Sequence, residues 1–156
     1  KKNYGEKKII DNSSIRYGIL NYVAKYSLAS NSYFVTSKCF EHLNNLGLMK
    51  KGKLLRGSKG SKNRFTFEHP IPSNVIADEV IKNIGDKNKI MNILRETDLV
   101  TVITYEENDM INRSGYVKKM PINSLTQKDM FARYKLSGVE VPTRRIKVYG
   151  AIARWI

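Results

Sequence analysis

An acidic residue and a histidine stand side by side near the middle of the chain, where a short apolar run meets two prolines. Glu68 and His69 end the run NRFTFEH, and Pro70 and Pro72 follow. Because proline cannot donate a hydrogen bond to a sheet, the strand predicted over residues 63–69 ends at His69. Histidine commonly moves protons near neutral pH, so His69 is a candidate general base. The alternative is a structural histidine bonded to the backbone beside the proline turn.

Further residues complete a set that could cleave a phosphodiester bond. That reaction needs a base for the attacking hydroxyl, an acid for the leaving oxygen and cations beside the phosphate. Tyr105 and Glu107 follow a run rich in β-branched residues, and Arg133 lies in the C-terminal third of the chain. Since the ends of central strands often line an active cleft, the expected catalytic group is His69, Glu68, Glu107, Tyr105 and Arg133.

The block FEHPIPSNVI, residues 67–76, resembles the opening motif of the HNH (ββα-metal) nucleases. In that family an Asp/Glu-His pair at a strand end precedes a proline and then a helix. The resemblance implies that His69 activates water and that Glu68 helps to hold a metal ion. This chain has no histidine after His69 and no cysteine pair to complete such a site. The metal ligands are therefore unknown, and both Mg²⁺ (or another divalent metal) and metal-free chemistry stay open.

The chain is strongly basic, with 28 Lys and Arg against 14 Asp and Glu and a formal net charge of +14. Such an excess favours a polyanionic partner, most often nucleic acid. Basic residues cluster between residues 50 and 64 without an acidic one among them, and two more adjoin near residue 145. A solvated, non-binding surface is the alternative. The predicted nucleic-acid contacts are Lys50, Lys51, Lys53, Arg56, Lys59, Lys62, Arg64, Arg144 and Arg145.

Hydrophobic periodicity and turn residues predict a mixture of helices and strands. Helices are expected over residues 13–29, 36–46, 74–84, 87–96, 107–114 and 126–137, with Thr36 or Ser37 and then Ser73 as N-caps. A loop is expected over residues 30–34. Residues 48–57 and 63–69 should pair as a basic hairpin, residues 99–104 should lie in the middle of the sheet, and residues 144–156 should form a terminal strand.

These elements indicate an α+β fold with a polar arm over residues 1–12 and a single domain over residues 13–156. Hydrophobic residues make up 41% of the chain, which is enough for a folded core. The lone cysteine, Cys39, excludes an internal disulfide, and no apolar run is long enough to cross a bilayer. We therefore expect a cytoplasmic protein without a membrane partner.

The combined features favour a small basic endonuclease of the restriction, toxin or mobile-element kind, with His69 as general base. The alternative is a winged-helix-like DNA-binding protein without catalysis, because residues 13–68 read as helix, loop, helix and hairpin. In that case the helix over residues 36–46 would enter the major groove. The choice between DNA and RNA stays open, and so does the choice between a monomer and a homodimer.

Overall fold

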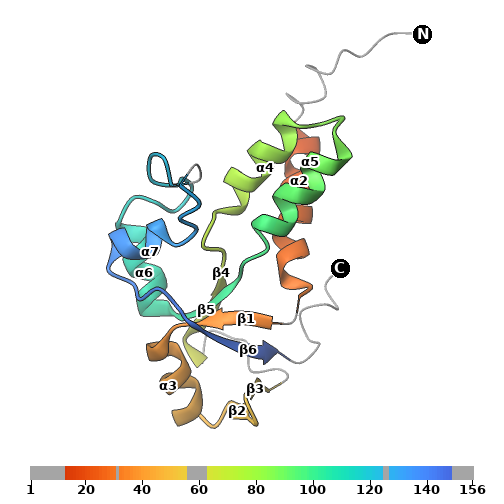
Figure 1. The fold of residues 1–156 in the computed structure, drawn as a ribbon. Helices are drawn as coiled ribbons and strands as arrows, with labels where there is room; N and C mark the ends of the chain where they lie inside the picture. The colour runs from red at the N-terminus through yellow and green to blue at the C-terminus, as the bar shows by residue number, and fades with distance from the viewer. Residues whose placement is uncertain (1–12, 31, 56–62, 125–126, 149–156) are drawn as a thin grey trace, which may run out of the picture.

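The protein folds around a mixed sheet, as the computed structural model shows for residues 13–30, 32–55, 63–124 and 127–148. The six strands have the order β2-β3-β6-β1-β5-β4. Helix α3 lies below this sheet in Figure 1, α6 and α7 lie to its left, and α2, α4 and α5 form a group above it. The predicted α+β class is confirmed. Within the described residues, no helix combines the length and the apolar character that crossing a bilayer requires.

The helices and strands alternate irregularly along the chain. In order they are α2 (Ser13–Leu28), β1 (Ser32–Val35), α3 (Ser37–Asn45), β2 (Met49–Lys50), β3 (Lys53–Leu54), β4 (Phe65–Glu68), α4 (Ser73–Lys82), α5 (Lys87–Glu96), β5 (Thr101–Thr104), α6 (Tyr105–Arg113), α7 (Ala132–Ser137) and β6 (Arg144–Val148).

The centre of the sheet contains a strand that the sequence did not predict. The loop expected over residues 30–34 is wrong, because residues 32–35 form β1, which pairs parallel with β5 and antiparallel with β6. Tyr33 and Val35 are buried on one face of β1. The flanking serines and asparagine favour a loop, whereas the Tyr-Phe-Val run fits a buried strand once β5 and β6 supply partners on both sides. As predicted, β5 lies inside the sheet, and all four of its residues are buried.

The basic hairpin is smaller than predicted. Strands β2 and β3 pair through the turn Lys51–Gly52, whose φ angles of 50° and 70° suit a two-residue hairpin turn. Strand β4 instead pairs antiparallel with β5 at the opposite edge of the sheet. The predicted pairing of residues 48–57 with residues 63–69 is therefore wrong. The early turn closes the hairpin locally, and the β-branched strand β5 offers β4 a better partner.

The two faces of the sheet are covered by different helices. One face packs against α3, whose Cys39 and Leu43 join Tyr33, Val102 and other strand residues in the largest buried cluster. On the opposite face, Ile103 packs with residues of α6, α7 and the segment after α7. The sheet is thus enclosed on both sides at β5.

Helix ends follow the predicted signals only in part. The Thr36 hydroxyl accepts a hydrogen bond from the Cys39 N–H and caps α3, which ends before Gly47 at a φ of 65°. Ser73 was expected to cap α4, but it is the first helical residue and Pro72 occupies the cap position without a side-chain hydrogen bond.

Helix α7 is shorter than predicted and ends at Gly138, whose φ is 73°. Of the strand predicted over residues 144–156, residues 144–148 form β6. Residues 149–156 lie outside the described residues.

Leu43 tests the packing of α3 on the sheet. Its side chain is fully buried, so Leu43→Ala should lower the free energy of unfolding by about 2–5 kcal/mol. Urea denaturation measures this loss. Leu136→Ala is the matched control because Leu136 is 59% exposed, and it should change stability by less than about 0.5 kcal/mol. Equal losses in the two variants would contradict the packing described for α3.

Candidate functional site

Glu68 and His69 lie at the end of β4, where the chain passes through Pro70–Pro72 into α4. There they border an open cleft of about 670 Å³ between α2, the start of α4 and the segment after α6. The cleft brings together three residues of the predicted catalytic group. Its polar and charged lining consists of Arg16, Asn21, Glu68, His69, Ser73, Asn74, Lys118 and Arg133.

A buried ion pair fixes the Glu68 carboxylate. Arg133 Nη2 donates to Glu68 Oε1 over 2.8 Å, and the Tyr134 hydroxyl donates to Glu68 Oε2 over 2.7 Å. The Arg133 side chain is only 2% exposed and that of Glu68 is 13% exposed. Burial raises the pKa of Glu68, while Arg133 and Tyr134 oppose this shift. Both carboxylate oxygens are therefore engaged by consecutive residues of α7.

His69 is held by backbone contacts on two sides. Its Nε2 lies 3.3 Å from the carbonyl oxygen of Ala24, and its own carbonyl accepts a hydrogen bond of 3.1 Å from Arg133 Nη1. Because a carbonyl only accepts, Nε2 carries the hydrogen and the lone pair of the neutral ring is on Nδ1. Burial lowers the pKa of His69 below its ordinary value of 6.5, and the charge of Arg133 acts in the same direction. The imidazole is therefore neutral near pH 7, the form that a general base requires.

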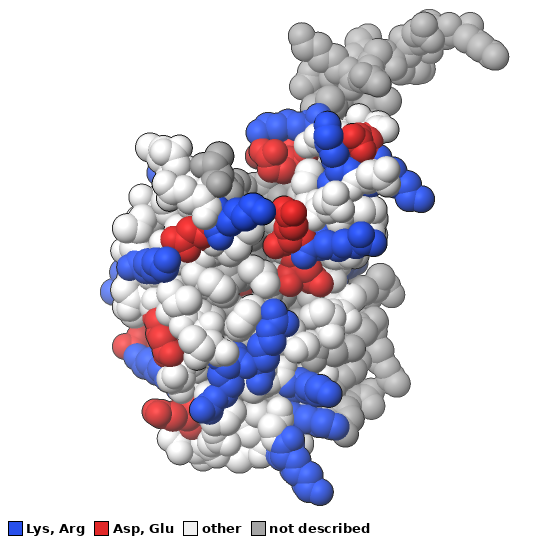
Figure 2. Space-filling view, viewed as in Figure 1, with Lys and Arg blue, Asp and Glu red and all other residues white. Residues whose placement is uncertain are grey.

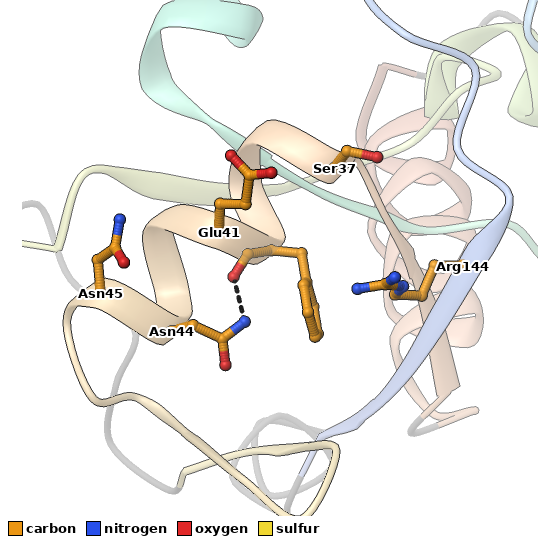
Figure 3. A pocket seen from close by; sticks show the side chains of 6 residues that line it. Ser37, Glu41, Asn44, Asn45 and Arg144 are labelled. Atoms are coloured by element: carbon orange, nitrogen blue, oxygen red, sulfur yellow. Dashed lines mark hydrogen bonds between the residues drawn. The ribbon is translucent and has the colours of Figure 1, made fainter.

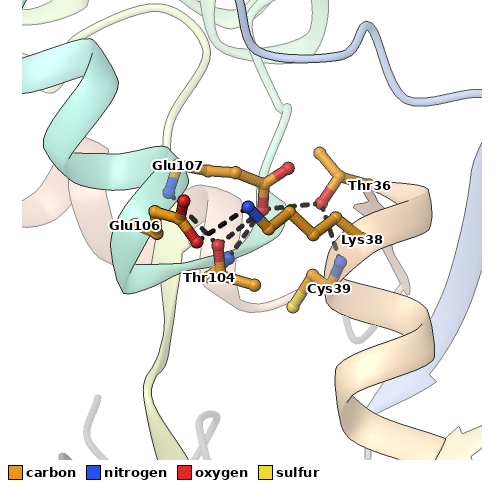
Figure 4. Close-up of polar contacts among 6 residues, drawn as sticks. All are labelled: Thr36, Lys38, Cys39, Thr104, Glu106 and Glu107. Carbon is orange, nitrogen blue, oxygen red and sulfur yellow. Dashed lines mark hydrogen bonds and ion pairs between the residues drawn. The ribbon is translucent and has the colours of Figure 1, made fainter.

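Glu107 and Tyr105 do not join this group. Glu107 is 4% exposed, and its Oε2 accepts hydrogen bonds from the Thr36 hydroxyl (2.9 Å) and from the Thr104 N–H (2.9 Å) and hydroxyl (3.0 Å), as Figure 4 shows. The Tyr105 N–H donates to the Arg64 carbonyl at the start of β4. The length of β4, about 13 Å of extended chain, separates this point from His69. Neither residue lines the cleft.

Two residues of the cleft and one residue that supports it were missed by sequence reasoning. Tyr134 follows Arg133 directly on α7, yet only the folded structure shows that both reach Glu68. Arg16 on α2 forms an ion pair with Asp78 of α4 at the cleft wall. Lys118 lies in the segment after α6, where no spacing or motif marks it. Their common signal is spatial, since Arg16, Lys118 and Tyr134 come from distant parts of the chain.

A row of cations crosses the sheet on the face that α3 does not cover. Lys50, Lys53 and Lys147 are successive cross-strand neighbours on β2, β3 and β6, and Arg145 lies two residues before Lys147 on the same face. We call these four residues the basic strip. Figure 2 shows Lys and Arg side chains gathered over the part of the molecule where Figure 1 places β6, β3 and β2. Cross-strand lysines repel one another, which favours a surface that an anion can bridge.

The other predicted nucleic-acid contacts are scattered. Lys51 lies in the turn beside the basic strip, whereas Arg64 is exposed at the start of β4 on the opposite edge of the sheet. The guanidinium of Arg145 lies 4.1 Å from the centre of the Phe34 ring, and that of Arg144 lies 4.1 Å from the centre of the Phe40 ring. Arg56, Lys59 and Lys62 lie outside the described residues.

No group of three or more His, Cys, Asp or Glu side chains suitable for a metal ion occurs in the described part of the chain. Strand β4, the Glu68–His69 pair, Pro70 and α4 follow one another in this order, and the antiparallel partner of β4 is β5, later in the chain. Comparisons with protein-family models, curated proteins and solved structures gave no match. Function must therefore be inferred from the residues themselves.

The lowered pKa of His69 predicts a pH dependence of stability. Below about pH 6.5 the unfolded chain gains a proton on His69 that the folded protein resists, so His69 should reduce stability as the pH falls. The free energy of unfolding of the wild type should decrease more than that of His69→Gln between about pH 7.5 and pH 5.5. The difference should stay below about 1.4 kcal/mol per pH unit. Parallel curves from urea denaturation would show that the imidazole is not held neutral.

Proposed function

We propose that the protein is a nucleic-acid-cleaving enzyme, a small basic endonuclease in which His69 is the general base. The observation that carries this proposal is the convergence of Glu68, His69 and Arg133 on one open cleft, beside Arg16 and Lys118. A neutral imidazole supplies the base and the cations supply charge beside the phosphate, while the leaving oxygen would take its proton from solvent water. The cleft volume of about 670 Å³ is large enough for a nucleotide.

In this mechanism Nδ1 of His69 accepts the proton of the attacking hydroxyl, which comes from water or from a ribose 2′-position. The hydrogen bond from Nε2 to Ala24 fixes the ring in the tautomer that leaves Nδ1 basic. Lys118 supplies positive charge to the phosphate, and Arg16, which also pairs with Asp78, adds to it. Arg133 acts as a positioning residue, because its two Nη atoms hold the Glu68 carboxylate and the His69 carbonyl.

The role of a metal ion is a separate question. Both oxygens of Glu68 accept hydrogen bonds from Arg133 and Tyr134, so a metal ion would have to compete with these donors for the carboxylate. This arrangement fits Glu68 as an orienting group better than as a metal ligand. Cleavage assays with and without added Mg²⁺ will show which chemistry the cleft uses.

The basic strip supplies the binding surface in this proposal. Arg145, Phe34, Thr101 and Glu68 are register neighbours on β6, β1, β5 and β4, so the strip and Glu68 belong to the same face of the sheet. Three strand spacings, about 14 Å, separate Arg145 from Glu68. Phe131 packs on Phe34 between them. Because α7 and the segment after it cover this face at β5, a bound strand of a few nucleotides would pass over their outer surface between the strip and the cleft.

A non-catalytic nucleic-acid-binding protein is the second candidate. It is favoured by the structural contacts of the cleft residues. His69 contacts the Ala24 carbonyl, and each oxygen of Glu68 accepts a hydrogen bond from a residue of α7. Its winged-helix form is not favoured, since β1 lies between α2 and α3 and β4 does not pair with the β2–β3 hairpin. In either case we propose a cytoplasmic location, which suits a chain whose lone cysteine, Cys39, has no disulfide partner within it.

The basic strip predicts a salt-dependent affinity. Replacing Lys50, Arg145 and Lys147 together with Ala should lower the slope of log K against log salt by about one unit for each phosphate that the protein no longer neutralises. Binding of a labelled single strand at several salt concentrations measures this slope. The control replaces Lys82, Lys87 and Lys89 on α4 and α5, which removes the same charge. Equal slopes for the two triple variants would move the interface away from the strip.

His69→Ala tests the catalytic role. If His69 is the base, single-turnover cleavage should slow by roughly 10²-fold or more, while affinity for the substrate stays close to that of the wild type. His42→Ala is the matched control, because His42 Nε2 also contacts a backbone carbonyl, that of Asn63, at 2.7 Å. Rates are corrected for the folded fraction, measured by thermal denaturation. A His69→Ala protein that cuts at the wild-type rate per folded molecule would eliminate the catalytic proposal.

A further inference from the structure

A second cavity lies at the other side of the sheet from the cleft, between α3 and the start of β6. Its volume is about 450 Å³, and its lining is Ser37, Phe40, Glu41, Asn44, Asn45 and Arg144 (Figure 3). None of these residues takes part in the cleft at His69. The cavity is therefore a separate site with its own set of hydrogen-bonding groups.

One wall of this cavity is formed by Arg144 and Phe40. The guanidinium lies over the ring at 4.1 Å from its centre, and Figure 3 shows the Arg144 side chain projecting from β6 toward α3. A guanidinium stacked on a ring keeps its N–H groups at the edge of the stack, where they can donate to a ligand. Arg144 thus presents a fixed pair of donors, and stacking lowers the entropy cost of using them.

The other wall is the exposed face of α3, which offers acceptors. Glu41, Asn44 and Asn45 are spaced three and four residues apart, so they lie on one side of the helix. Asn44 Nδ2 donates to the Phe40 carbonyl over 2.9 Å, which directs its amide and leaves Oδ1 as an acceptor. The Glu41 side chain is exposed and carries two further acceptor oxygens. The cavity lining therefore combines the donors of Arg144 with acceptors on α3.

We propose that this cavity binds guanine. Guanine carries N–H donors at N1 and N2 on one edge and the acceptors O6 and N7 on the opposite edge. A carboxylate such as that of Glu41 accepts from the first edge, and a guanidinium such as that of Arg144 donates to the second. Adenine places a donor beside N7, and pyrimidines have no second edge of acceptors. The cavity therefore discriminates guanine by both walls at once.

The inference rests on the proposed function and deepens it, because it names the base that the substrate carries. Arg144 is adjacent to Arg145 of the basic strip, and in the sheet the start of β6 extends beyond the residues that pair with β3. A strand bound along the strip can therefore turn one base around this edge into the cavity. Since Glu41 binds the edge of guanine that pairs with cytosine, the base must be unpaired.

Binding of free nucleotides tests the cavity without any cleavage step. Isothermal titration with GMP, AMP, CMP and UMP compares ligands that share one phosphate, so the basic strip contributes equally to all. GMP should bind roughly tenfold more tightly than the others or better. Inosine monophosphate, which lacks the N2 amine, and 7-deaza-GMP, which lacks N7, should each lose most of this preference. Equal affinities for the four nucleotides would overturn the proposal.

Conservative variants assign the preference to the two walls. Glu41→Gln and Arg144→Lys should each reduce the ratio of GMP to AMP affinity to within about twofold, since each removes one paired contact. Asp109→Asn and Arg113→Lys on α6 make the same chemical changes outside the cavity, and they should keep the wild-type ratio. A ratio that survives both cavity variants would locate guanine binding elsewhere.

The source of the guanine is distinguished by short strands. Single-stranded DNA and RNA hexamers with one central guanine should bind more tightly than the same strands with adenine, and a duplex of the guanine strand should lose that advantage. A duplex that keeps it would overturn the unpaired geometry. All titrations are repeated with His69→Ala. Guanine preference in a protein that never cleaves supports the cavity and removes only the nuclease proposal, whereas cleavage without guanine preference removes only the cavity.

Discussion

One buried carboxylate holds the junction from which the rest of the structure branches. Glu107 accepts hydrogen bonds from Thr36 and Thr104, the residues at which the parallel strands β1 and β5 pass into α3 and α6. These two helices then diverge to opposite faces of the sheet. Helix α7 packs on α6 and carries the pair of side chains that fix Glu68. The position of the cleft thus depends on a contact at the far end of β4.

The sheet is covered unevenly: it is packed on both faces around β5, but one face of β2, β3 and β6 carries charged side chains. Around β5 both faces are packed, and the strand is fully buried. On β2, β3 and β6 the face away from α3 carries lysine and arginine, which favour water or an anion over an apolar neighbour. Leu54, Ile146 and Val148 alternate with these cations and bury the other face. The same short strands therefore build the core and the proposed binding surface.

Local signals in the sequence located the elements well, but they could not determine partners. Helix α2 is marked by the spacing of its apolar residues and strand β5 by its β-branched residues, and both were predicted close to their observed bounds. The partner of β4 depends on β5, which comes much later in the chain, and proximity in sequence favoured a hairpin instead. Strand β1 is only four residues long, so its neighbours in the sheet decide its conformation more than its own composition does. Likewise, Arg133 meets Glu68 across 65 residues of chain.

The structural role of Glu107, by contrast, can be predicted from the sequence, because Thr104-x-x-Glu107 has the spacing of a capping box.

The order of strands also has a consequence for synthesis on the ribosome. Strand β6 lies between β3 and β1, so the sheet stays in two pieces until translation has passed residue 148. Contacts this distant in sequence form slowly, and they cannot form before both partners exist. The row of cations that joins Lys53 to Lys147 is likewise incomplete on the nascent chain. The proposed binding surface is therefore absent from any nascent chain that ends before β6.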